Sequence, residues 1–156
     1  MVTAWDIAAT IVDPEIPVLT IEDLGVLREV VEDGDRVRVD LTPTYSGCPA
    51  IDAMRDDVRS ALEGAGYREV EVRTVLAPAW TTDWMTEDGK RKLHDYGITP
   101  PNARAADGRV ALRMAVKCPR CDSLDTREVA RFGSTSCKAL YECASCLEPF
   151  DFFKVL

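Results

Sequence analysis

Two closely spaced cysteine pairs constrain the fold of this chain more than any other feature of its sequence. Cys118 and Cys121 form one Cys-x-x-Cys pair, and Cys143 and Cys146 form another, with 21 residues between the pairs. Each pair can place two thiolates on one ion, so both pairs together complete a tetrahedral site. We therefore expect one structural zinc ion per chain, held in a C-terminal zinc ribbon. Iron, alone or in a cluster, is the alternative ion for four thiolates.

The ribbon is expected to depend on this metal for its folding. Alternating segments at 110–116 and 150–155 predict short strands around the site. Residues 110–156 are too few to bury a large hydrophobic core. In comparable zinc-binding peptides, the bound metal contributes on the order of 10 kcal/mol to the free energy of folding. A further cysteine, Cys137, is expected roughly 20 Å along a strand from Cys143, too far to join the same ion. It is interpreted either as a small buried residue or as an exposed second thiol.

The residues before the ribbon predict a small α+β domain. Hydrophobic periodicity and turn residues indicate five elements in the order α-β-β-α-β, at residues 3–12, 26–32, 36–42, 49–63 and 69–76. In the second strand Val37, Val39 and Leu41 alternate with charged residues, which is typical of a half-buried strand. The sequence therefore predicts a small open sheet with helices packed on it.

Composition divides the chain into an acidic body and a cysteine-rich tail. Residues 1–109 contain 12 Lys and Arg against 21 Asp and Glu, whereas residues 110–156 contain seven against six. Pro100 and Pro101 open a polar run that is typical of a linker. We therefore predict a first domain over 1–100, with a helical extension that carries Trp80 and Trp84, and a zinc-ribbon domain over 101–156.

The charge balance and the apolar segments also restrict the location and the partners. The tail is too weakly basic to neutralise many phosphates, so nucleic acid is not expected as a partner. No apolar stretch approaches the roughly 18 to 20 residues that a membrane helix needs, and the N-terminus has no secretory pattern. We expect a cytoplasmic protein, because paired cysteines in a reducing compartment bind metal more often than they form disulfides.

One cysteine, Cys48, lies outside the tail, at the predicted junction of a strand and a helix. Unpaired amide groups and the positive end of the helix dipole are expected to favour its thiolate. The alternative interpretation is a small packed residue at a turn. The single histidine, His94, could serve Cys48 as a base. However, its position on a polar helix beside Lys92 and Asp95 is typical of a solvated side chain.

Several segments of the chain resemble known families. The segments DPEIPVLTIEDLGVL (13–27) and LTPTYSGCPA (41–50) are similar to the small domain shared by SufT and the eukaryotic cytosolic iron–sulfur targeting factor. The segments WTTDWMTEDGKRKL, GITPP and CPRCDS…FGSTSCKALYECASCLEPFDFFK resemble the D subunits of bacterial phenylacetyl-CoA epoxidase, the PaaD or PaaJ family. This second resemblance covers nearly the whole chain.

The resemblance implies an accessory factor of a multicomponent di-iron monooxygenase in aerobic phenylacetate degradation. It implies a role in assembling a metal centre, such as the iron–sulfur cluster of the reductase component, without catalytic activity of the factor itself. The implied partners are the reductase and oxygenase components and the iron–sulfur assembly machinery. The sequence agrees, because it lacks the Glu-x-x-His pairs of a di-iron bundle and any flavin or nicotinamide motif.

The resemblance also assigns residues to sites. Asp13, Glu15 and Cys48 match the exposed loop-and-thiol site of the family and are expected to contact iron or a cluster in transit. The four cysteines of the two pairs match its zinc ribbon, and Cys137 matches a cysteine without an assigned role. The alternative function is a non-catalytic scaffold that bridges oxygenase and reductase, and a homodimer is left open.

Overall fold

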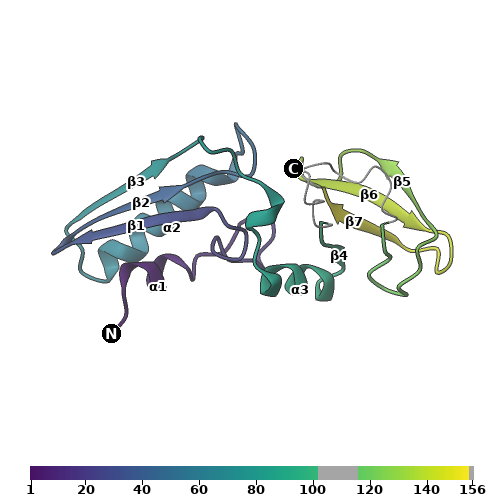
Figure 1. Ribbon diagram of the computed structural model, residues 1–156, viewed down its shortest axis with the longest axis horizontal. Helices are drawn as coiled ribbons and strands as arrows, with labels where there is room; N and C mark the ends of the chain where they lie inside the picture. Colours follow the sequence, from purple (N-terminus) through teal and green to yellow (C-terminus); the bar gives the residue numbers. More distant parts are fainter. Residues whose placement is uncertain (102–115, 155–156) are drawn as a thin grey trace. The chain divides into compact units, whose positions relative to one another are not determined.

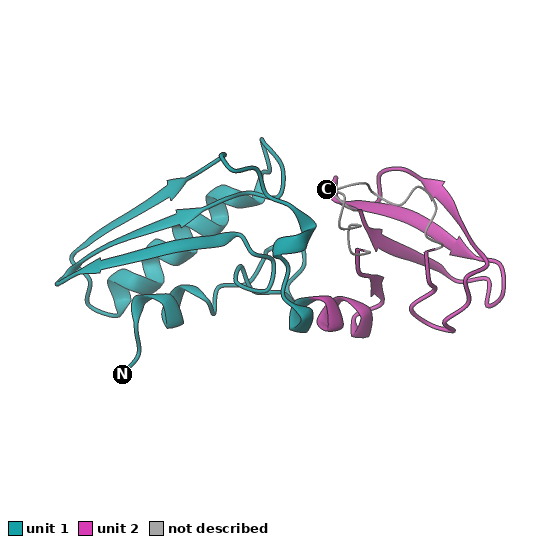
Figure 2. Cartoon of the chain, in the orientation of Figure 1, with its two compact units in different colours: residues 1–89 teal, residues 90–156 magenta. Residues whose placement is uncertain are grey.

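The computed structural model describes residues 1–101 and 116–154, in two compact units (Figure 2). The first unit spans Met1–Gly89 and the second begins at Lys90. The division falls within a helix, and the boundary expected after residue 100 stays a prediction. The strand predicted over 110–116 lies outside the described residues, except for Val116. Within the described residues, no helix is long and apolar enough to cross a membrane.

The first unit is built on a three-stranded sheet, as the sequence predicts. Its strands are β1 (Leu27–Asp33), β2 (Arg36–Leu41) and β3 (Glu69–Thr74), in the order β1-β2-β3 (Figure 1). β1 and β2 form the expected antiparallel hairpin. β3 pairs with β2 in parallel, because helix α2 (Ala50–Gly64) carries the chain back along the sheet.

The helices of this unit pack through small apolar stripes. In α2 the buried residues are Ala50, Met54, Val58 and Leu62, and α2 contacts both β3 and α1. Helix α1 spans Ala4–Ala8 and begins with a capping box between Thr3 and Asp6. It ends four residues before the predicted end at Val12. The reason is tertiary, because Val12 forms a β-bridge with Thr20 and its backbone is therefore extended.

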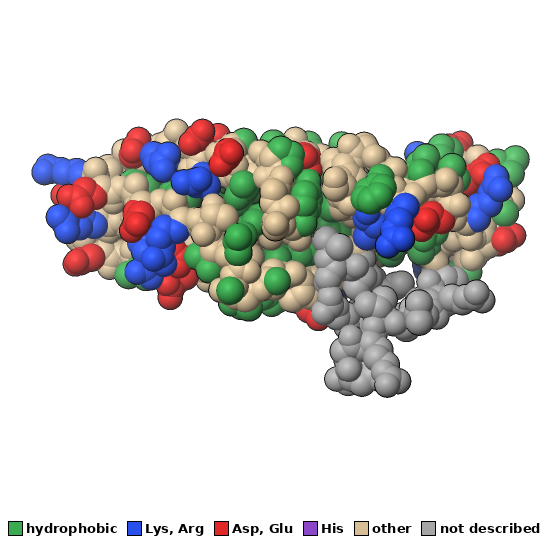
Figure 3. Space-filling view, turned by 90° about the horizontal axis from the view of Figure 1, so that it is seen from above, with side chains coloured by type: hydrophobic (Ala, Val, Ile, Leu, Met, Phe, Trp, Pro, Cys, Tyr) green, Lys and Arg blue, Asp and Glu red, His purple; other side chains and the backbone are tan. Residues whose placement is uncertain are grey.

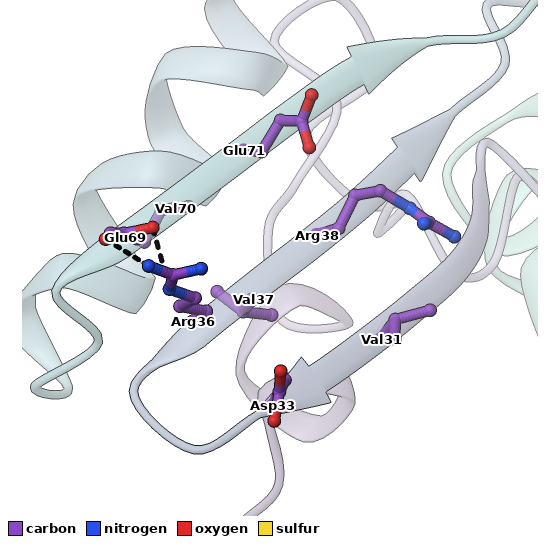
Figure 4. A pocket seen from close by; sticks show the side chains of 8 residues that line it. All are labelled: Val31, Asp33, Arg36, Val37, Arg38, Glu69, Val70 and Glu71. Atoms are coloured by element: carbon purple, nitrogen blue, oxygen red, sulfur yellow. Dashed lines mark hydrogen bonds and ion pairs between the residues drawn. The ribbon is translucent and has the colours of Figure 1, made fainter.

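The sheet face that carries the β2 arginines has paired charges rather than a ligand site. A shallow hollow of about 500 Å³ lies on this face. Figure 4 draws the side chains that line it, which are Val31, Asp33, Arg36, Val37, Arg38, Glu69, Val70 and Glu71. Arg36 turns toward Glu69 and forms an ion pair with it at 2.9 Å. Acidic and basic side chains also lie next to one another over this unit, at the left of Figure 3. The hollow is therefore part of a solvated, salt-bridged surface.

Asp40 forms the strongest of these charge pairs, and its loss should destabilise the first unit. The buried Asp40 carboxylate accepts two hydrogen bonds from Arg73, at 2.8 and 2.6 Å. These bonds hold its pKa below the ordinary value. We expect Asp40→Asn to lower the free energy of unfolding at pH 7 by roughly 2 kcal/mol. Urea unfolding followed by tryptophan fluorescence measures this change, because all three tryptophans lie in the first unit.

The pH dependence and a control variant identify the cause of this loss. Because the pKa of Asp40 is lower in the folded state, its contribution is present above its ordinary pKa and disappears as the pH falls through the folded-state value. The difference between wild type and Asp40→Asn should therefore shrink toward pH 3. Arg36→Gln removes the exposed pair with Glu69 and should change stability by no more than about 0.5 kcal/mol. An equal loss in both variants would contradict the prediction.

The segment after β3 packs onto the loop that precedes β1. The Trp80 indole N–H donates to the Leu24 carbonyl at 2.8 Å, and the Thr86 N–H donates to the Asp23 carbonyl at 2.9 Å. The Trp80 side chain is buried and belongs to the core of this unit. Trp84 lies in the short helix η1 (Thr82–Trp84), whereas Trp80 precedes it. The predicted helical extension is therefore interrupted, and it continues in α3 (Glu87–Asp95).

The second unit contains a four-stranded sheet in the order β4-β7-β6-β5. Its strands are β4 (Ile98–Thr99), β5 (Thr126–Ala130), β6 (Lys138–Cys143) and β7 (Pro149–Phe153). β5, β6 and β7 form antiparallel pairs, and β4 pairs with β7 in parallel. A small core cluster contains Val116, Cys118, Cys143, Phe150 and Phe152. Two of its five members are cysteines of the predicted metal site, so the core and the site are built together.

Candidate metal centre and thiol site

The four predicted ligands come together in the second unit. Cys118 and Cys121 lie in the turn before β5, Cys143 ends β6, and Cys146 lies in the turn that leads to β7. Their sulfur atoms all lie within 4.8 Å of one another. The Sγ atoms of Cys118 and Cys146 are 3.8 Å apart, and those of Cys121 and Cys143 are 3.6 Å apart. A tetrahedron with metal–sulfur bonds of about 2.3 Å has edges of about 3.8 Å, so the set fits a single ion.

The electrostatics of the four sulfurs also favour a bound cation. Backbone N–H groups of Cys146 and Ser145 lower the pKa of the Cys143 thiol. The N–H of Ser123 also lowers the pKa of the Cys121 thiol. Burial and hydrogen bonds with the other thiols outweigh this effect and raise the pKa of Cys121 to about 12. Four thiolates at this spacing repel one another, so a cation is needed to keep them all deprotonated.

This centre is closed by protein ligands and is suited to a structural role. Cys118 and Cys143 are fully buried, whereas Cys121 is exposed at the surface. With four sulfur ligands on a tetrahedral ion, no position stays open for water or substrate. Cys137 lies outside the four-sulfur group and is only 5% exposed. Its interpretation as a small buried residue is confirmed, and its interpretation as an exposed thiol is wrong.

Cys48 lies in the tight turn between β2 and α2, as predicted. Gly47 adopts a φ of 83°, in the left-handed region that favours glycine, and the turn is closed by a bond from the Cys48 N–H to the Tyr45 carbonyl. The sulfur is close to the Ala50 N–H at the start of α2 and to the Tyr45 side chain. Cys48 is 7% exposed, but its neighbours Gly47 and Pro49 are exposed, so the thiol lies just beneath the surface.

The thiolate expected at Cys48 is not what the structure favours. Burial raises the pKa of the Cys48 thiol above its ordinary value, and the negative charges of Glu15 and Asp13 raise it further. The Ala50 N–H and the Tyr45 side chain act in the opposite direction but are outweighed. The helix start alone would favour the thiolate, but desolvation and the two carboxylates reverse its effect. The free thiol is therefore the neutral form at pH 7.

The Asp13–Glu15 loop lies near this thiol, but its two carboxylates differ in role. Asp13 is buried, and its Oδ1 accepts the N–H groups of Glu15 at 2.6 Å and Ile16 at 2.9 Å. Asp13 therefore holds the loop in shape, as Asx turns do. Glu15 is partly exposed. Among the described residues, only the four tail cysteines bring ligand atoms close enough for one ion, so Cys48, Asp13 and Glu15 form no closed coordination sphere.

Tyr45 lies beside the Cys48 thiol, whereas His94 is exposed on a polar helix. Tyr45, three positions before Cys48, contacts the thiol and was not predicted as a site residue. Its proximity in the segment TPTYSGCPA is the signal that could have identified it. His94, weighed as a base for Cys48, is exposed and has Asp95 at 3.5 Å and Asp122 at 4.0 Å as its charged neighbours. These acidic neighbours agree with a solvated histidine on a polar helix.

Two protein families match different parts of the chain. Residues 5–74 match the family described as iron–sulfur cluster assembly protein, and residues 102–154 match the PaaD zinc beta ribbon domain. Among solved structures, a crystal structure from Bacillus anthracis, described as a domain of unknown function (DUF59), has a TM-score of 0.54 at 27% identity. The match covers 58% of this chain and 87% of that one.

One relative extends the likeness over nearly the whole chain, and a second matches about half of it. A protein of Escherichia coli (strain K12), provisionally named as the D subunit of 1,2-phenylacetyl-CoA epoxidase, is 49% identical over 152 residues, which cover 97% of this chain and 91% of that protein. An Fe-S protein maturation auxiliary factor of Porphyromonas gingivalis is 37% identical, covering 54% of this chain and 81% of its own length. The chain therefore belongs to the PaaD family, the D subunits of phenylacetyl-CoA epoxidase, in which an iron–sulfur assembly domain precedes a zinc ribbon.

Proposed function

We propose that the chain is an accessory maturation factor of the phenylacetyl-CoA epoxidase system in aerobic phenylacetate degradation. It would assist the assembly of an iron–sulfur cluster or another metal centre in a partner subunit, and it would have no catalytic activity of its own. Its partners would be the reductase and oxygenase components and the iron–sulfur assembly machinery. Iron or a cluster is the cargo of this process.

One observation carries the proposal: a thiol just beneath the surface, beside two carboxylates, in a domain that matches an iron–sulfur assembly family. Cys48 lies close enough to Glu15 and Asp13 that their charges raise its pKa. The relatives that share this domain alone are named as maturation factors, and the P. gingivalis protein is 37% identical to this chain. In this site Cys48 would supply a soft sulfur donor, and Glu15 and Asp13 would supply a negative potential for a cationic iron species.

The protonated state of Cys48 suits transient binding. An iron species that binds the sulfur must displace its proton, so binding is weaker than at a preformed thiolate. Negative charge from Glu15 and Asp13 attracts the cation and offsets part of this cost. A single sulfur from this chain also leaves the remaining positions of the iron open to a donor or an acceptor protein. Loading and release can therefore occur at the same site.

We also propose that the four tail cysteines bind one structural zinc ion per chain. Zinc is suited to a closed tetrahedral sulfur site and undergoes no redox change there. In this arrangement the ribbon serves as a folded docking module, and the metal handling takes place in the first unit.

The test of the maturation function is the Cys48→Ser variant. We expect this variant to fold and to retain about one zinc per chain, because Cys48 lies outside the four-sulfur group. Cells that carry it should contain reductase component with severalfold lower cluster occupancy, measured by iron and sulfide content and visible absorption. Cys137→Ser is the matched control, since Cys137 is also buried and also lies outside the metal site. Normal cluster occupancy in Cys48→Ser would count against maturation.

A scaffold that bridges oxygenase and reductase is the second candidate. The observation in its favour is the low exposure of Cys48, at 7%, together with its raised pKa, which are typical of an unreactive thiol. This function predicts stable co-purification with both components. It also predicts that Cys48→Ser changes neither the co-purification nor the cluster occupancy.

A further inference from the structure

We propose that the metal-bearing end of the ribbon docks another subunit of the epoxidase through Leu147. The surface, called here the knuckle end, contains Leu124, Asp125, Leu147 and Glu148. Its partner would present an apolar pocket bordered by Lys and Arg side chains. This inference rests on the proposed function, since it names the part of the chain that holds the partner while the first unit handles metal.

Leu147 places a large apolar side chain at a knuckle position where the fold of the chain does not need one. Its φ is 63°, in the left-handed region where leucine is disfavoured and glycine is usual. Its side chain is 73% exposed, so it adds nothing to the hydrophobic core. The corresponding position after Cys121 is Asp122, also with a φ of 63°, a residue type that tolerates this conformation better. A strained and exposed leucine therefore points to a contact outside the described structure.

Leu124 lies at the same end of the ribbon and is 61% exposed. The two knuckles are joined beside it, because the Ser123 and Ser145 hydroxyls are 2.8 Å apart and the Ala144 N–H donates to the Asp125 carbonyl at 2.8 Å. The Leu147 N–H in turn donates to the Cys143 carbonyl. Hydrogen bonds thus fix the backbone beside both leucines, so less conformational entropy is lost when their side chains are buried against a partner.

The charges around the leucines define the partner. Asp125 and Glu148 are exposed next to Leu124 and Leu147 respectively, and Arg120 is the exposed basic residue of the first knuckle. Asp122 already has Lys117 at 3.5 Å. Asp125 and Glu148 outnumber Arg120, so the knuckle end keeps a net negative border, which fits a basic border on the partner. The same border disfavours a second copy of this chain, because like charges would face one another.

The test uses a substitution with opposite effects on stability and on binding. Leu147→Gly relieves the backbone strain, so its melting temperature should equal or exceed that of the wild type, with unchanged zinc content. Its affinity for one of the purified oxygenase or reductase subunits should fall on the order of tenfold or more, as expected for the loss of one buried leucine. Leu147→Glu should lower the affinity further. Leu76→Gly removes a leucine of the first unit that is 59% exposed, and it should leave the affinity unchanged.

Several outcomes would overturn the inference. The inference is wrong if Leu147→Gly and the wild type bind every subunit with equal affinity. It is also wrong if the wild type binds none of them. A dimer in sedimentation experiments that Leu147→Gly dissociates would identify a second copy as the occupant instead. The maturation function fails separately: Cys48→Ser should bind the subunit normally, so unchanged cluster occupancy in that variant would leave the docking surface standing.

Discussion

Replacement of Cys143 by serine is expected to unfold the ribbon of the second unit and to leave the first unit folded. Cys143 is fully buried, ends β6, and belongs both to the four-sulfur group and to the small core with Phe150 and Phe152. Loss of one of four ligands weakens a site whose occupancy contributes on the order of 10 kcal/mol to the folding of such modules. Without the metal, this core is too small to hold the strands together.

Three measurements check this outcome, two on the ribbon and one on the first unit. Zinc content and hydrogen exchange of the β6 and β7 amides report on the ribbon. The zinc should be lost, and the amides should exchange as fast as those of an unfolded segment. Tryptophan fluorescence reports on the first unit alone and should be unchanged, since Trp5, Trp80 and Trp84 all lie there. Cys137→Ser is the control and should retain the metal. Protected β6 amides in metal-free Cys143→Ser would show that the core suffices and would contradict the prediction.

The metal centre was predictable because its information is local. Two residues between the cysteines of each pair set the geometry of each knuckle, and nothing distant has to be known. The same holds for the hairpin of β1 and β2, where residues Gly34 and Asp35 form the turn between Asp33 and Arg36. The apolar stripe of α2 follows from its helical period, which brings the buried residues Met54, Val58 and Leu62 onto one face.

The properties that sequence reasoning missed depend on residues far apart in the chain. The early end of α1 results from the bridge between Val12 and Thr20, and local helix propensity cannot indicate it. The raised pKa of Cys48 results from burial and from Glu15 and Asp13, more than 30 positions away in the sequence. The helix start next to Cys48 was anticipated, but its effect is smaller than theirs. Local patterns thus located the thiol but could not establish its ionisation.

The contact between the 80–89 segment and the loop before β1 also joins residues far apart in the sequence, and its disruption should strongly destabilise the first unit. Gly25 has a φ of 74°, and a Cβ there would lie 2.4 Å from the Trp84 carbonyl oxygen and 2.8 Å from its carbonyl carbon. The obstructing atoms are mainly backbone, so they cannot move aside as a flexible side chain could. Gly25→Ala should therefore combine the left-handed strain with a steric overlap and cost roughly 3 kcal/mol or more.

Gly34→Ala separates these two causes. Gly34 in the hairpin turn has a φ of 63°, and a Cβ there would meet nothing within 4 Å. It should therefore cost only about 1 to 2 kcal/mol, from the backbone conformation alone. Urea unfolding at pH 7, followed by tryptophan fluorescence, compares both variants with the wild type. In Gly25→Ala the Trp80 indole should also lose its bond to Leu24 as the segment is displaced, which shifts its emission in the absence of urea. If the two variants lose the same free energy of unfolding, the 80–89 segment moves aside for the added methyl group. The close packing at Gly25 would then not be what fixes the position of that segment.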